Sequence, residues 1–115
     1  MNMPETDLEM IDITIEAAKE EIGKYEALQR LLRNKDFQLV IMDSYIKDES
    51  TRIALATANP ALAGAAEQVK LHDGIKAIGY LNQFFVTTRH IADAANKAII
   101  DNEATRDELL AEEGV

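Results

Sequence analysis

The sequence predicts an all-α protein, a bundle of three main helices with coiled-coil-like seams. Two rows of residues carry this prediction, because each alternates in steps of four and three, the spacing of a packed helix face. The first row is Gly74, Ile78, Leu81, Phe85, Thr88, Ala92, Ala95 and Ile99. The second row is polar only at Gln29 and comprises Leu8, Ile11, Ile15, Ala18, Ile22, Tyr25, Gln29 and Leu32.

The first helix is predicted at about residues 7–33. Thr6 can act as its N-cap, and Glu9, three residues later, completes the capping-box pattern. Gly23 lowers helix propensity, yet the row continues on both sides of it, so the helix is expected to pass through.

The second helix is predicted at about residues 36–58. Asp36 is a good N-cap before Phe37, and the helix should stop at Asn59-Pro60, because proline disfavours helical geometry in the residue before it. The small residues 60–66 then form a short connector.

The third helix is predicted at about residues 65–101. Beyond it, Asn102 could cap a short fourth helix through Leu109 and Leu110, or the long helix could run on. The sequence leaves both alternatives open.

Length and composition predict one helical domain over residues 1–115, with frayed ends at 1–5 and 111–115. The chain has no cysteine, which excludes disulfides, thiolate nucleophiles and Cys-ligated metals. No apolar run approaches eighteen residues, so we expect no transmembrane helix and no membrane partner.

The formal net charge is −9, and the acidic residues concentrate near both ends of the chain. Such ends repel phosphates, so direct nucleic-acid binding is not expected. Acidic ends suit either solubility or attraction to a basic partner surface, and both interpretations stay open.

No catalytic or cofactor motif accompanies the helical pattern. A carboxylate metal site in a bundle needs Glu-x-x-His pairs, but Val69 precedes His72 by three residues and Thr87 precedes His90. Nucleotide-cradling and hydrolase motifs are also absent from the sequence. We therefore expect no enzyme activity, no cofactor and no metal.

The third helix carries the candidate interaction residues. Phe84 and Phe85 point about 100° apart on a helix and cannot both enter one narrow seam. Tyr80, Phe84, Ile91 and Ala95 form a flank beside the main seam. The predicted self-association interface is Ile78, Leu81, Phe84, Phe85 and Ile91. We expect a homo-oligomer, while the copy number, and whether the seam lies within one chain or between chains, stay open.

Two stretches, Asn34–Ala58 followed by Pro60, and Ala77–Phe85, resemble small acidic helical proteins encoded by tailed bacteriophages. The resemblance implies a virion or assembly role, with another phage structural protein as a partner. It implies a location in the cytoplasm of an infected bacterium, with the virion as an open alternative. It carries over no site residue.

A different class of function also fits the acidic ends. The chain could inhibit a host protein by occupying its basic nucleic-acid-binding surface, with carboxylates in place of phosphates. The acids available for this role are Glu9, Glu16, Glu20, Asp107, Glu108 and Glu112.

Overall fold

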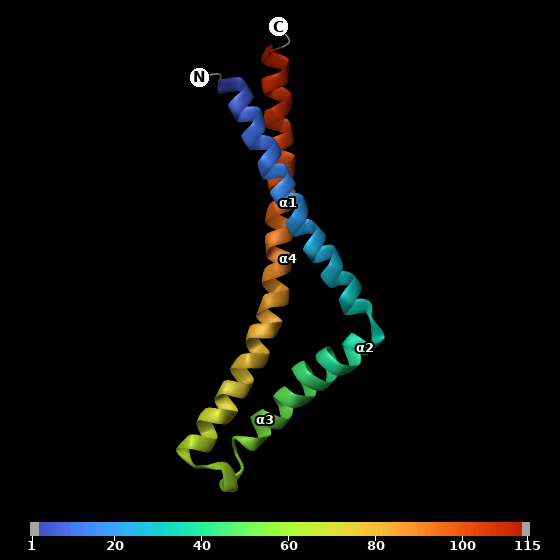
Figure 1. The fold of residues 1–115 in the computed structure, drawn as a ribbon. Coiled ribbons are helices and arrows are strands. Elements are labelled where there is room, and N and C mark those ends of the chain that lie inside the picture. Colours follow the sequence, from blue (N-terminus) through green and yellow to red (C-terminus); the bar gives the residue numbers. More distant parts are fainter. Residues whose placement is uncertain (1–2, 114–115) are drawn as a thin grey trace. The chain divides into compact units, whose positions relative to one another are not determined.

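The computed structural model describes residues 3–113, with side chains from Asp7 onward, and contains only helices, turns and bends within that range. The elements are α1 (Met3–Arg33), α2 (Lys35–Phe37), η1 (Gln38–Glu49), α3 (Ser50–Ala56), η2 (Pro60–Leu62) and α4 (Ala65–Glu113) (Figure 1). The predicted all-α class with three main helices is confirmed. Contacts divide the chain into two units, Met1–Ala27 with Thr87–Val115, and Leu28–Val86.

The first unit is a pair of antiparallel helices. The start of α1 lies beside the end of α4, and the two helices run in opposite directions (Figure 1). Its buried residues alternate along the predicted seams: Ile11, Ile15 and Ala18 from α1, and Ala92 and Ala95 from α4. Arg106 Nη1 approaches Asp12 Oδ1 at 3.4 Å across the pair. Alanines on one helix and isoleucines on the other let the two backbones approach closely.

α4 is one uninterrupted helix through Glu113, so the short fourth helix does not form. The Asn102 side chain donates from Nδ2 to the Ala98 carbonyl at 2.7 Å and therefore bonds within α4. The seam continues past Ile99, because Asn102, Arg106 and Leu109 are half-buried at the same spacing. Because Asn102 and Arg106 are polar, a hydrophobicity pattern does not reveal this continuation.

Two details of α1 correct the sequence prediction. The helix begins at Met3, so Thr6 lies inside it and the prediction that Thr6 is its N-cap is wrong. The seam passes through Leu28, which is 8% exposed, while Gln29 is exposed. A step of three from Tyr25 to Leu28 keeps an apolar side chain on the packed face. Residues 3–5 and 111–113 are helical, whereas 1–2 and 114–115 lie outside the described residues.

In the second unit, Asn34 begins the helical segment after α1. Asn34 has extended backbone angles, φ −71° and ψ 126°, and its Oδ1 accepts a hydrogen bond from the Phe37 amide at 3.0 Å. This satisfies an otherwise unpaired N–H of the first turn. The predicted N-cap Asp36 is wrong, since Asp36 lies within that first turn.

Replacing Asn34 with Ala should remove this cap and lower the free energy of unfolding by about 1 kcal/mol. Urea unfolding followed by circular dichroism measures the change. Asn34→Ser is the matched control, because its hydroxyl can accept the same hydrogen bond. Equal losses in the two variants would contradict a capping role.

The segment η1 is a π-helix, a winding that the sequence did not predict. π-Helices bond each amide to the carbonyl five residues earlier and usually span a single turn. The less exposed residues recur here in adjacent pairs every four positions, as Ile41 and Met42, Tyr45 and Ile46, and Glu49 and Ser50. This period exceeds that of the seams in α1 and α4 and accords with a wider turn.

The helix after η1 ends at Ala56, two residues before the predicted boundary. Asn59 is extended, and its Oδ1 accepts from the Ala61 amide at 3.0 Å, which starts η2 with Pro60 at its first turn. Gln68 then fastens the connector, because its Nε2 donates to the Leu62 carbonyl at 2.8 Å. The predicted stop at Asn59-Pro60 thus corresponds to a new short helix.

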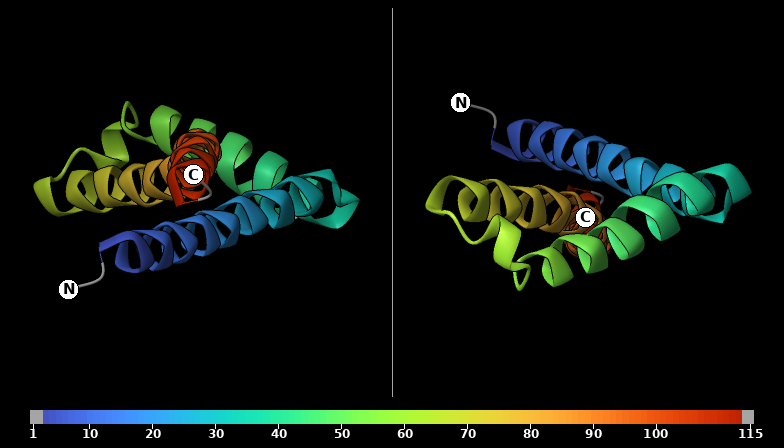
Figure 2. Two further views of the ribbon diagram at one scale, coloured as in Figure 1. Left: turned by 90° about the horizontal axis from the view of Figure 1, so that it is seen from above. Right: turned by 90° about the horizontal axis from the view of Figure 1, so that it is seen from below.

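α3 and the beginning of α4 follow one another across the connector (Figure 2), and each contributes a buried isoleucine to the second unit. Ile53 is 5% exposed and Ile78 is 4% exposed. A Cβ placed on Gly74 would lie 3.0 Å from Ile53 Cδ1, so a larger residue there would require the Ile53 side chain to shift by a few tenths of an ångström. Gly74 of the predicted seam therefore packs against Ile53 of α3.

Candidate interaction surfaces

The five predicted interface residues divide into a packed group and an exposed group. Ile78 is buried, and Leu81 and Phe85 are half-buried within the second unit. Phe84 is 64% exposed in the same unit, and Ile91 is 44% exposed in the first unit. Within a single chain, only Phe84 and Ile91 therefore present most or much of their side chain to a partner.

The two adjacent phenylalanines belong to one aromatic cluster in the second unit. The Phe85 ring meets Phe37 edge-on with centroids 6.1 Å apart, and it meets Phe84 at 6.3 Å. Both separations lie in the favourable range for edge-to-face rings. Phe37 and Phe85 hold the start of the second helical segment against α4, and Phe84 extends the cluster to the surface.

A second row of residues on α4, the outer row, alternates in steps of three and four beside the seam. It comprises Ala77, Tyr80, Phe84, Thr87, Ile91, Ala94 and Ala98. Tyr80 is 70% exposed, and of the seven residues only Ala98 is half-buried. Ala95, which the sequence placed in both the seam and the flank, is buried at 7% and belongs to the seam. The same three-four spacing in the sequence could have identified the whole row.

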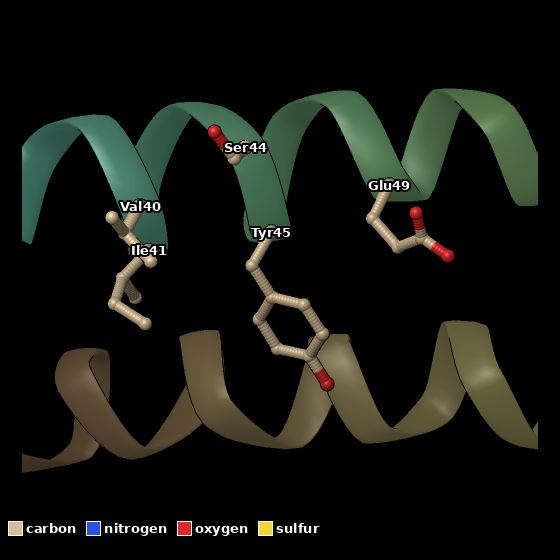
Figure 3. A pocket seen from close by; sticks show the side chains of 5 residues that line it. All are labelled: Val40, Ile41, Ser44, Tyr45 and Glu49. Atoms are coloured by element: carbon tan, nitrogen blue, oxygen red, sulfur yellow. The ribbon is translucent and has the colours of Figure 1, made fainter.

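An open depression of about 420 Å³ lies on η1 (Figure 3). Val40, Ile41, Ser44, Tyr45 and Glu49 line it, and the Tyr45 ring extends from η1 toward α4. Ser44 Oγ donates to the Leu39 carbonyl, five residues earlier, at 2.7 Å. Its hydroxyl thus satisfies a carbonyl of the π-helix, and the depression carries no cluster of catalytic groups.

Glu49, which lines this depression, forms an ion pair with Arg52. The Arg52 guanidinium hydrogen-bonds the Glu49 carboxylate and lowers the pKa of Glu49, and the same contact raises the pKa of Arg52. Because the folded pKa of Glu49 is lowered, the pair stabilises the fold above the ordinary carboxyl range and loses that effect as pH falls through the folded pKa. Arg52 is exposed and Glu49 is half-buried, so the pair is a contact at the surface between neighbouring turns.

The first unit carries an exposed acidic row on α1. A depression of about 410 Å³ there is lined by Asp12, Ile13, Glu16, Ala17 and Glu20. Ile13 is 63% exposed between these carboxylates. Lys19 lies 3.6 Å from Glu16 and partly offsets the charge. Of the predicted inhibitor acids, this row contains Glu16 and Glu20.

Among residues 3–113, no group of three or more His, Cys, Asp or Glu side chains is arranged to hold a metal ion. Within the same range, no helix has the length and apolar character needed to cross a membrane. His72 and His90 are both exposed on α4.

Taken together, the fold and its surfaces define an all-α protein with exposed aromatic side chains on its longest helix and exposed aliphatic side chains on several helices. Comparison with protein-family models, curated proteins and solved structures finds no match.

Proposed function

We propose that this chain is a non-enzymatic assembly protein that self-associates through α4 and binds another structural protein. The observation that carries the proposal is the exposure of Tyr80, Phe84 and Ile91 along the outer row. Complete burial of one large apolar side chain stabilises an assembly by about 1.5–3 kcal/mol. The outer row therefore offers a driving force for association.

The resemblance of residues 34–58 and 77–85 to small acidic helical phage proteins supports the finer part of this proposal. We place the assembly in a tailed bacteriophage, with a phage structural protein as the second partner. The net charge of −9 supports solubility before assembly, because like-charged copies repel one another at long range.

The proposal predicts that the molar mass in solution rises with protein concentration. In Phe84→Asp the same rise should require a protein concentration at least tenfold higher. A charge in a desolvated contact loses its hydration, so the associated state is disfavoured. Light scattering over a concentration series, at low and at high salt, measures the effect.

Ile100→Asp is the matched control on the same helix, since Ile100 is 66% exposed and lies off the outer row. Circular dichroism checks that both variants retain their helices. A mass equal to one chain at every concentration and both salt levels would contradict self-association. Such a monomer would favour the alternative, an inhibitor that presents its acidic row to a basic host surface and binds less tightly as salt increases.

A further inference from the structure

We infer that the occupant of the outer row is a second copy of α4 running antiparallel, with Phe84 packed on the partner's Ala94 and Tyr80 on the partner's Ala98. This inference rests on the self-association proposed above and specifies its geometry. All residues of the row lie on one continuous helix, so their common face follows from the helical period alone.

The sizes of the side chains favour this register. The row carries its two rings at one end, at positions 80 and 84, and its small residues at the other, at 94 and 98. An antiparallel pair places each ring over an alanine of the other copy, and Ile91 over the partner's Thr87. Large residues facing small ones fill space without voids. A parallel pair would place rings on rings and alanine on alanine, which leaves a gap at one end.

The charges at the ends of the row favour the same register. Lys76 immediately precedes the row, Asp73 precedes Ala77 at the row's own spacing, and Asp101 follows Ala98 at that spacing. In the antiparallel register Lys76 comes beside the partner's Asp101, and the two-fold symmetry forms this pair twice. Both residues are exposed in the single chain. In a parallel pair, lysine would lie beside lysine and aspartate beside aspartate.

The area of the row indicates a reversible contact. Tyr80 and Phe84 together expose on the order of 250 Å², given the area that buried aromatic side chains cover and their exposures of 70% and 64%. With the isoleucine and the small residues the row approaches roughly 500 Å², below the ~800 Å² that each partner of a standard interface buries. A second copy is therefore expected to bind and release with concentration.

Cysteine cross-linking of the full chain tests the register, because the natural sequence contains no cysteine. Lys76→Cys and Asp101→Cys are prepared separately, mixed, and treated with a short thiol-specific cross-linker at a concentration where the wild-type mass has risen. The mixture should give a covalent dimer of one chain of each kind, at least tenfold more than either variant alone. In the antiparallel register two copies of position 76 lie more than about 30 Å apart along the axis.

A mixture of Lys97→Cys and Asp101→Cys is the control. These positions are about 30 Å apart in the antiparallel register but within about 6 Å in a parallel one. Efficient cross-linking in this control, or of Lys76→Cys with itself, would overturn the inference in favour of a parallel pair. A dimer by mass with no product from the first mixture would overturn the register while leaving self-association standing. A monomer by mass would defeat both.

Discussion

Replacing Ile53 with Ala should lower the free energy of unfolding by about 2–5 kcal/mol, the range for deleting a buried isoleucine side chain. Ile53 is 5% exposed, and its Cδ1 faces the Gly74 backbone of α4 within the second unit. Neighbours can partly fill a cavity by moving side chains into it, but Gly74 has none to move. We therefore expect a loss toward the upper part of that range.

Leu55→Ala provides the matched control for this measurement. Leu55 lies on the same helix and is 71% exposed, so its removal should change the free energy of unfolding by less than about 0.5 kcal/mol. Urea unfolding followed by circular dichroism measures both variants. Similar losses in the two would show that the contact of α3 with α4 does not stabilise the second unit.

Replacing Gly74 with Leu should lower the free energy of unfolding by up to about 2 kcal/mol, the net of an overpacking cost of about 1–3 kcal/mol and a helix-propensity gain of roughly 1 kcal/mol. The first added carbon would already lie 3.0 Å from Ile53 Cδ1, and the rest of the side chain would enter occupied space. Relief would require α3 and α4 to separate within the second unit. The cost of this overpacking exceeds the propensity gain of roughly 1 kcal/mol.

Gly79→Leu separates packing from propensity. A Cβ at Gly79 meets nothing within 4 Å, so this variant should gain up to about 1 kcal/mol. Combining Gly74→Leu with Ile53→Ala should recover part of the loss, with a coupling energy of about 0.5–3 kcal/mol between the two sites. Strict additivity of the two changes would refute the direct contact as the cause.

The helical periods of α1 and α4 could be predicted from residues alone. Every predicted seam position from Gly74 to Ile99 is buried or half-buried in the structure. A helix repeats its faces over a few residues, so spacing identifies a packed face without knowledge of its neighbour. In α1 one predicted position is wrong, since Leu28 rather than Gln29 continues the seam.

The N-caps and the π-helical winding could not be predicted from residue spacing, because they depend on which groups form hydrogen bonds in the folded chain. Asn34, Asp36 and Thr6 are all acceptable N-caps by residue type, and only the fold selects Asn34. The π-helical segment η1 likewise contains no glycine or proline that could indicate it in the sequence. Its four-residue recurrence of less exposed side chains follows from packing against α4, where Phe37 meets Phe85.

For the interaction surface of α4, too, one part could be predicted from the sequence and another depended on the fold. Residue spacing was enough to assign apolar faces to the third helix and to exclude the familiar catalytic motifs. Which face is covered within one chain depended on the fold, because Ile78, Leu81 and Phe85 pack internally while Tyr80 and Phe84 remain exposed. Both faces have the same period and similar composition. Whether a helix face is buried depends on the element that packs against it, and the residues of the helix itself do not identify that element.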